Sequence, residues 1–128
     1  MLPTSTARAN AHYNLGVALV NQGRIDEAIH QYRQALLFDP HKAETHNNLA
    51  NLLQLTGRLE EAVASYHQAL RCRPDCAEAY ANLGTALSDL GRLDEAVACY
   101  QQALRLKPDC AEIYNNLGLV LVEQGQLA

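Results

Sequence analysis

The stretches Arg71-Cys72-Arg73-Pro74-Asp75-Cys76-Ala77-Glu78 and Arg105-Leu106-Lys107-Pro108-Asp109-Cys110-Ala111-Glu112 are two versions of one segment, 34 residues apart. Residues 43–76 and 77–110, laid over one another, share 20 identical residues in 34. The same register extends back over residues 9–42 and forward into a shorter unit, residues 111–128, so that it accounts for 120 of the 128 residues. A fixed period of this length is typical of repeat proteins, in which each unit packs on its neighbours.

Each unit is predicted to form two helices and no strand. Apolar side chains recur at helical spacing in residues 77–90 and again in the stretch that follows Asp94. Asp94 is expected to cap the second helix, and Pro108 is expected to end the unit because proline cannot continue a helix. Glycine tolerates the left-handed conformation that often stops a helix. The glycines expected to stop the first helices are Gly23, Gly57, Gly91 and Gly125.

Small residues and tyrosines recur at fixed places in the units. A helix pair can reach the short end of the ~8–10 Å packing range only where the side chains between the helices are small. The small residues on the first helices are Gly16, Ala50, Gly84 and Gly118. The tyrosines on the second helices, expected to fill the space between one pair and the next, are Tyr32, Tyr66 and Tyr100.

The pattern Tyr80-x2-Leu83-Gly84-x2-Leu87, followed by Ala96-x3-Tyr100 and Pro108, resembles the tetratricopeptide repeat (TPR). The leading Trp of that pattern is replaced here by His12, His46, Tyr80 and Tyr114. The resemblance implies an all-α, right-handed superhelical solenoid of helix–turn–helix repeats. The implied parts are an N-terminal leader (1–8), three repeats (9–42, 43–76 and 77–110) and the first helix of a truncated fourth repeat (111–128).

The resemblance further implies that the first helix of each repeat lines a concave, peptide-binding groove. Its groove positions are the second, fifth, sixth, ninth, twelfth and thirteenth of each unit, and the sixth is asparagine throughout: Asn14, Asn48, Asn82 and Asn116. Further polar groove residues are Asn47, Asn51, Thr85 and Asn115. A side-chain amide offers one acceptor and two donors, enough to bond both the N–H and the C=O of an extended peptide.

This row of amides resembles the asparagine ladder in the superhelical TPR region of protein O-linked N-acetylglucosaminyltransferases. Two interpretations stay open at this point. The asparagines grip the backbone of a bound peptide, or asparagine is simply a common residue of the TPR pattern at this position.

A second binding mode of the TPR family is not expected. Co-chaperones that hold the acidic tail of heat-shock chaperones use a carboxylate clamp of Lys, Asn, Asn, Lys and Arg, because charge-assisted bonds need those cations. The matching residues here are Tyr13, Val17, Asn48, Glu78 and Asn82. Glu78 would repel a carboxylate and, with Glu44 and Glu112, predicts a neutral to mildly acidic groove.

The four cysteines are interpreted as structural or incidental thiols, because the repeat register accounts for their places. Cys76 and Cys110 are equivalent positions of neighbouring units, and Cys72 stands where Phe38 and Leu106 stand in the others. A zinc site or a redox pair is the alternative. Ser65 and Ser88 lack a plausible base and orienting acid within a repeat, so no catalytic residue is predicted and the chain is not expected to be an enzyme. No metal and no cofactor are expected either.

The amino-acid composition argues against several other classes of function. Apolar residues make up 48% of the chain and charged residues 19%, which permits a packed core. A net charge of −4 argues against nucleic acid as a partner. No apolar run approaches the ~20 residues that span a bilayer, so no membrane partner is expected. The first eight residues contain no apolar signal region, so a cytoplasmic location is expected.

The sequence therefore predicts a protein–protein interaction scaffold that binds an extended peptide or a partner helix in its concave groove. The alternative is a substrate-recruiting TPR fragment of a larger glycosyltransferase-like enzyme. Leu117, Val120 and Leu121 on the last helix are expected to be uncovered, which predicts self-association into a homo-oligomer.

Overall fold

The computed structural model describes residues 2–127, apart from the side chain of Leu127, and contains seven α-helices and no strand in that range. Met1 and Ala128, the outermost residues of the predicted leader and fourth unit, lie outside the described residues. The helices are α1 (Ser5–Asn21), α2 (Ile25–Phe38), α3 (Ala43–Leu55), α4 (Leu59–Cys72), α5 (Ala77–Asp89), α6 (Leu93–Leu106) and α7 (Ala111–Leu127).

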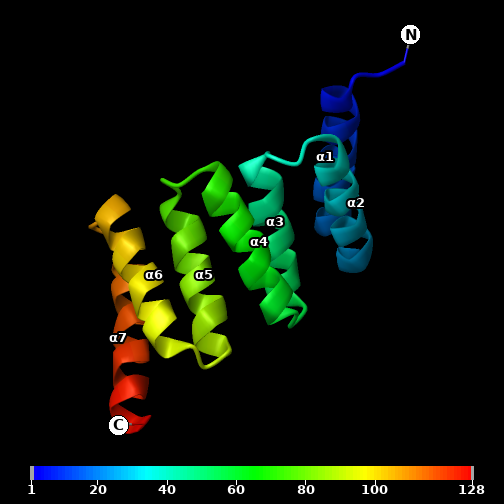
Figure 1. Ribbon diagram of the computed structural model, residues 1–128. Coiled ribbons are helices and arrows are strands. Elements are labelled where there is room, and N and C mark those ends of the chain that lie inside the picture. The colour runs from blue at the N-terminus through cyan, green and yellow to red at the C-terminus, as the bar shows by residue number, and fades with distance from the viewer. Residues whose placement is uncertain (1, 128) are drawn as a thin grey trace.

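The helices stack in one row from the N-terminus to the C-terminus (Figure 1). α1 packs on α2, α3 on α4 and α5 on α6, and each second helix also contacts the first helix of the next pair. The first helices α3 and α5, and α5 and α7, touch one another directly. The predicted all-α helical-repeat fold is confirmed. We call the surface formed by α1, α3, α5 and α7 the groove face.

Glycine stops three of the four first helices, as predicted. Gly23, Gly57 and Gly91 have φ values of 75°, 79° and 80°, in the left-handed region that glycine adopts without steric cost. The next residue then donates its backbone N–H to the carbonyl five residues back, for example Arg58 N to Leu53 O at 2.8 Å, as in a Schellman motif.

Gly125 was wrongly predicted as a stop. α7 continues through Gly125 to Leu127, and nothing lies within 4 Å of a Cβ built on Gly125. In the other units, a packed second helix holds the left-handed turn in place. Three residues follow Gly125 in this chain, too few to form such a helix, so the last turn stays helical.

The prediction that Asp94 caps α6 was also wrong. α6 begins at Leu93, its N-cap residue Arg92 makes no side-chain cap, and Asp94 is the second helical residue. Arg92 Nε instead bonds Glu95 Oε2 at 2.5 Å, within a first turn whose acidic side chains favour the helix dipole. Asp94 Oδ1 accepts a bond from Gln124 Nε2 at 2.6 Å and so links α6 to α7.

The first helix begins earlier than the predicted boundary between leader and repeat. α1 starts at Ser5, and Thr4 caps it by accepting the Ala7 N–H on its Oγ1 at 3.0 Å. The guanidinium of Arg8 lies 5.6 Å from the ring centroid of Phe38, so a cation–π contact ties this extra turn to α2. Residues 5–8 of the predicted leader are therefore helical.

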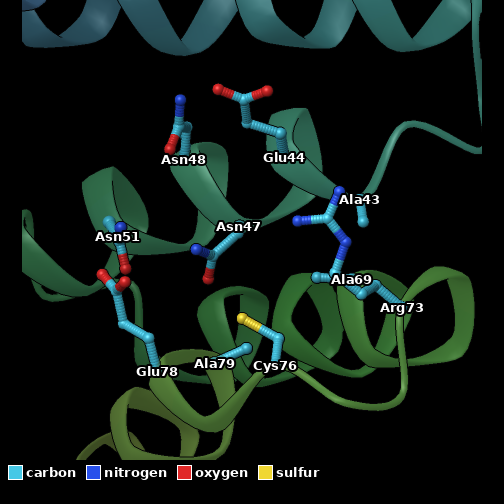
Figure 2. A pocket seen from close by; sticks show the side chains of 10 residues that line it. All are labelled: Ala43, Glu44, Asn47, Asn48, Asn51, Ala69, Arg73, Cys76, Glu78 and Ala79. Atoms are coloured by element: carbon cyan, nitrogen blue, oxygen red, sulfur yellow. The ribbon is translucent and has the colours of Figure 1, made fainter.

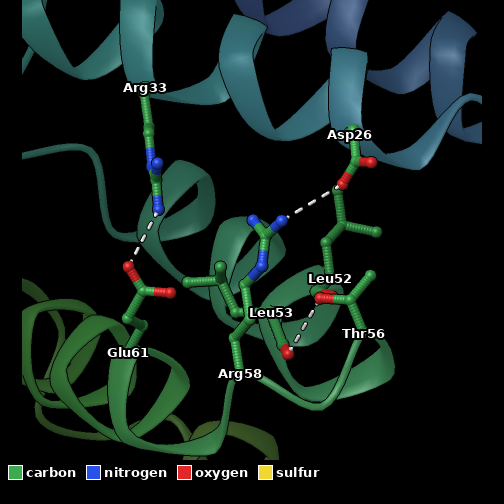
Figure 3. Close-up of polar contacts among 7 residues, drawn as sticks. All are labelled: Asp26, Arg33, Leu52, Leu53, Thr56, Arg58 and Glu61. Carbon is green, nitrogen blue, oxygen red and sulfur yellow. Dashed lines mark hydrogen bonds and ion pairs between the residues drawn. The ribbon is translucent and has the colours of Figure 1, made fainter.

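Ion pairs join consecutive repeats at the turns and on the second helices (Figure 3). Arg58 reaches back to Asp26 at 3.4 Å, and Arg33 reaches forward to Glu61 at 3.4 Å. These side chains are all more than 40% exposed, so each pair is worth only ~0–1 kcal/mol. The pairs help to set the register between units, while the apolar core supplies most of the stability.

The core is built around the repeated tyrosines and the small residues below them. A Cβ on Gly16 would lie 2.7 Å from Cε1 of Tyr32, and one on Gly84 would lie 2.9 Å from Cε1 of Tyr100. The two rings are each 2% exposed. Each ring thus packs on the glycine of its own helix pair, a contact that the sequence analysis did not predict, and the small residues permit the expected close approach.

The last helix is only partly as predicted. Val120 is 2% exposed and Leu117 is half-buried against the core, so their predicted exposure was wrong. They are covered because they face α6 across the same interface that earlier units use. The large apolar side chains that α7 leaves exposed are Tyr114, Leu119, Leu121 and Val122. Self-association through this helix stays a prediction, and no helix among residues 2–127 has the length and hydropathy to cross a bilayer.

Candidate peptide-binding groove

The four register asparagines all lie on first helices. Asn14 is exposed, whereas Asn48, Asn82 and Asn116 are half-buried. Asn48 Nδ2 donates to Tyr13 Oη at 3.0 Å, and Asn82 Nδ2 donates to Asn51 Oδ1 at 3.3 Å. Two of the four amides therefore connect neighbouring first helices, and each retains one N–H and a carbonyl for a ligand.

Two of the clefts on the groove face have matching linings, one repeat apart. Cleft A, between α3 and α5, has a volume of about 300 Å³ (Figure 2). It is lined by Ala43, Glu44, Asn47, Asn48, Asn51, Ala69, Arg73, Cys76, Glu78 and Ala79. Cleft B, between α5 and α7, has a volume of about 330 Å³. It is lined by Ala77, Glu78, Ala81, Asn82, Thr85, Lys107, Cys110, Glu112, Ile113 and Asn116. Nine lining residues of cleft A have their counterparts, 34 positions later, in cleft B.

The clefts bring together six of the eight residues predicted for the groove. Three of them line cleft A: Asn47, Asn48 and Asn51. Another three line cleft B: Asn82, Thr85 and Asn116. The remaining two, Asn14 and Asn115, are exposed and line neither cleft.

Sequence reasoning missed one cation at each cleft. Arg73 lines cleft A and Lys107 lines cleft B, although the groove was predicted to be neutral or acidic. Figure 2 shows the Arg73 side chain extending toward Ala43 at the edge of cleft A. The two cations stand 34 residues apart, directly before the proline that ends each unit, and this register could have identified them.

A polar network runs behind the clefts. The Tyr66 hydroxyl lies 2.5 Å from Asn51 Oδ1 and 2.8 Å from Gln54 Oε1, and the Tyr100 hydroxyl lies 2.8 Å from Thr85 Oγ1. A hydroxyl has one hydrogen, so either Asn51 or Gln54 must turn its NH2 group toward Tyr66. Asn47 Oδ1 is buried and has no hydrogen-bond partner among the described residues. Such an acceptor is costly to leave unpaired.

A further cleft of about 320 Å³ opens between α1 and α3, and Tyr13 lines it together with Asn48 and Asn51. Its lining does not repeat that of clefts A and B, because Tyr13 itself contacts the Glu44 and Asn48 side chains there. Tyr13 holds the register position of Asn47 and Ala81. Its hydroxyl donates to Glu44 Oε1 at 2.6 Å and accepts from Asn48 Nδ2 at 3.0 Å. Lys42 Nζ lies 4.6 Å from the centroid of the ring, a cation–π distance.

Burial and, after it, the hydrogen bond to the Glu44 carboxylate together raise the pKa of Tyr13 from 10.0 to about 12. Between these two pH values the unfolded chain has lost the phenol proton while the folded chain retains it. The stability that this proton contributes is complete below about pH 10 and is lost as the pH rises through about 12. Burial also raises the pKa values of Tyr32, Tyr66 and Tyr100.

We therefore expect Tyr13→Phe to lose less stability than the wild type when the pH is raised from about 9 to about 11. The difference should be measured by urea unfolding at both pH values. Tyr32, Tyr66 and Tyr100 remain in the variant, so part of the alkaline loss should persist. Equal losses in the two proteins would contradict the role assigned to the Tyr13 proton.

The cysteines are all free and half-buried. Burial raises the pKa of Cys99 to about 11, which keeps that thiol protonated and unreactive near neutral pH. Cys76 and Cys110 line the clefts, so they are groove residues that sequence reasoning assigned no role. Within residues 2–127, no cluster of three His, Cys, Asp or Glu side chains is arranged to hold a metal ion.

The stacked pairs of helices, repeated every 34 residues, define a helical-repeat protein. The chain belongs to the tetratricopeptide repeat family: the family described as "Tetratricopeptide repeat" matches residues 13–77 and 47–97, and the family described as "TPR repeat" matches residues 85–125. The predicted TPR membership is confirmed. The likeness of the groove to that of the O-linked N-acetylglucosaminyltransferases stays a prediction.

Solved structures share this fold along the chain. The first TPR of Spaghetti (RPAP3), bound to the HSP90 peptide SRMEEVD, has a TM-score of 0.89 and 24% identity, with all of both chains covered. The structure of MamA has a TM-score of 0.88 and 22% identity over 91% of this chain and 68% of that one. The Arabidopsis OM64 TPR domain has a TM-score of 0.86 and 21% identity over 91% and 96% of the two chains. At these identities the likeness shows the fold alone. A search of the curated proteins found no match.

Proposed function

We propose that this chain is a protein-interaction module that holds an extended peptide along the groove face. The observation that carries the proposal is the pair of clefts that repeat with the 34-residue period, each lined by side-chain amides from first helices. Peptide-binding surfaces of solenoid proteins follow their repeats in this way, because each unit presents the same positions to the ligand.

The amides are suited to a peptide backbone. Asn82 donates one side-chain N–H to Asn51, and Asn48 donates one to the Tyr13 hydroxyl. Each amide keeps its second N–H and its carbonyl for a ligand. One free donor and one free acceptor match the C=O and N–H of a single residue, which point to the same side of an extended peptide. Backbone groups occur in every peptide, so this contact supplies affinity, while the clefts between the amides supply preference for particular side chains.

A ligand with a strongly acidic tail is not part of the proposal. The structural neighbour Spaghetti is bound to the acidic peptide SRMEEVD. Here the groove face carries Glu44, Glu78 and Glu112 in register, against Arg73 and Lys107 as the cations that line the clefts. Like charges brought together at a binding surface cost free energy, so the acidic heptapeptide serves as a negative comparator.

The test is the double substitution Asn48→Ala and Asn82→Ala. A peptide selected from a randomised 12-residue library against the wild-type chain would be labelled, and its dissociation constant measured by fluorescence anisotropy. Each amide is expected to make one donor and one acceptor bond, so four lost backbone hydrogen bonds at ~0.5–1.5 kcal/mol each predict roughly thirtyfold or greater weakening of binding. Each alanine also removes a bond between first helices, so far-ultraviolet circular dichroism must show that the variant stays helical.

The matched control is Gln68→Ala with Gln101→Ala, which removes two exposed amides from the second helices α4 and α6. This control should bind the selected peptide as the wild type does, and SRMEEVD should bind neither protein. Unchanged affinity of the Asn48→Ala, Asn82→Ala protein would exclude the amides as backbone contacts. Equal weakening in the control would show that the peptide does not lie on the groove face.

A further inference from the structure

The interface between α1 and α3 contains an occupant supplied by the chain itself. The Tyr13 hydroxyl lies between the carboxylate of Glu44 and the amide of Asn48, which are four residues apart and therefore share one side of α3. Lys42 covers the ring at 4.6 Å from its centroid. A glutamate, an asparagine and a nearby cation, arranged in this way, can therefore hold a tyrosine side chain.

Cleft B contains a glutamate and an asparagine equivalent to those that hold the Tyr13 hydroxyl, but it contains no tyrosine at the position of Tyr13. Glu112 and Asn116 of α7 stand 68 positions after Glu44 and Asn48, and both line the cleft. The register position of Tyr13 is Ala81, whose methyl group leaves the space open. Within residues 2–127, neither Glu112 nor Asn116 makes a side-chain hydrogen bond or an ion pair, in contrast to Glu44 and Asn48.

We propose that cleft B is the recognition site for a tyrosine side chain of the bound peptide, with its hydroxyl held between Glu112 and Asn116. The proposal rests on the proposed function, because the tyrosine belongs to the peptide in the groove. It deepens that function by naming the side chain that the groove selects.

The walls of cleft B fit an aromatic ring. Lys107 lines the cleft and supplies a cation for the face of the ring, as Lys42 does for Tyr13. Cys110 holds the register position of Lys42, and its polarisable sulfur is a favourable neighbour for an aromatic edge. The apolar side chain of Ile113 also lines the cleft. With a volume of about 330 Å³, cleft B is larger than serine or threonine would fill.

Cleft A is a weaker candidate for the same ligand. Asn47 projects into its middle, so the position that is open at Ala81 is partly occupied (Figure 2). Asn82, the counterpart of Asn116, already donates to Asn51 at 3.3 Å. Cleft A therefore serves as an internal comparison for cleft B.

The first arm of the test compares three blocked tripeptides: acetyl-Gly-Tyr-Gly-amide, its phenylalanine form and its phosphotyrosine form. Binding is followed by two-dimensional NMR through the side-chain amide signal of Asn116, with that of Asn47 as the cleft A comparison. The phenylalanine form lacks the hydroxyl and should bind about tenfold more weakly. The phosphotyrosine form should not bind at the same concentration, because its negative charge faces Glu112 and Glu78.

The second arm of the test fills cleft B with a side chain of the protein itself. Ala81→Tyr places a phenol in the position that Tyr13 holds, so it should abolish the response of the Asn116 signal to the tyrosine peptide. The matched control Gln68→Tyr adds the same side chain to an exposed position on α4 and should leave the response intact. Glu112→Gln, at an exposed carboxylate, should reduce the preference for tyrosine over phenylalanine even if Ala81→Tyr fails to fold.

Equal binding of the tyrosine and phenylalanine peptides would overturn the proposal. So would an Asn116 signal that the tyrosine peptide does not move. If library-selected peptides still depend on Asn48 and Asn82 in that case, peptide binding on the groove face stands and only the tyrosine site fails. If the selected peptides bind independently of both asparagines, the proposed function fails as well.

Discussion

Replacing Tyr66 by alanine is expected to lower the free energy of unfolding by ~3–5 kcal/mol, a large part of the stability of a domain of this size. The Tyr66 side chain is 0% exposed, and its hydroxyl bonds Asn51 and Gln54 on the facing helix. The substitution leaves a cavity and two amides without their partner. Tyr66 belongs to the middle helix pair, so both neighbouring interfaces should weaken with it.

Tyr66→Phe is the matched control, because it keeps the ring and removes only the hydroxyl. We expect it to cost ~1–2 kcal/mol, the penalty for buried polar groups that lose their partner. Both variants should be measured by urea unfolding followed by circular dichroism. A loss below about 1 kcal/mol for Tyr66→Ala would mean that the site collapses around the smaller residue and that the ring does not hold the helix pair together.

Valine at Gly84 and valine at Gly118 are expected to have very different effects on the free energy of unfolding, although both glycines hold the same register position. A Cβ on Gly84 would lie 2.9 Å from Cε1 and 3.0 Å from Cζ of Tyr100, and this ring is buried on all sides. Overpacking of this kind costs ~1–3 kcal/mol, and the branched side chain places Gly84→Val at about 3 kcal/mol or above. Nothing lies within 4 Å of a Cβ on Gly118, so Gly118→Val should change stability by no more than about 0.5 kcal/mol.

Ala50 shows why valine, and not alanine, is the informative substitution. The second unit carries an alanine at this register position and buries it fully, so one methyl group can be accommodated there. Thermal or urea unfolding of the two valine variants would measure the difference. Equal effects would show that the close contact between Gly84 and Tyr100 does not constrain this position.

Much of the fold could be predicted from the period alone, because identical residues 34 positions apart must have equivalent surroundings in a stacked array. The turns at Gly23, Gly57 and Gly91 follow from the same argument, since a left-handed residue is needed wherever the second helix folds back on the first. Gly125 departs from the pattern because, among the described residues, it has no packed second helix to hold the turn. The register thus predicts local structure only where the packing partner is also present.

The candidate groove could be predicted less completely. The asparagines of the sixth position were identified from the sequence, since amides one repeat apart form a row on any stacked array. The role of Tyr13 was not, because its contacts join α1 to Glu44 and Asn48 of the next unit, more than 30 residues away. Arg73 and Lys107 line the clefts from the ends of second helices, and only the packing of those ends beside the first helices brings them there.

The sequence by itself determined the repeat, its helices, the stops between them and the family. These properties depend on local backbone preferences and on a periodic pattern of apolar residues, and both can be recognised within a single unit of the sequence and its repeats. The tertiary structure decided which groove positions are filled and which are open. Tyr13, Asn47 and Ala81 hold the same register position, yet the first places its hydroxyl between Glu44 and Asn48, the second leaves a buried oxygen unpaired and the third lines a cleft of about 330 Å³. That difference depends on side chains from two neighbouring units meeting in space, which no single unit of the sequence contains.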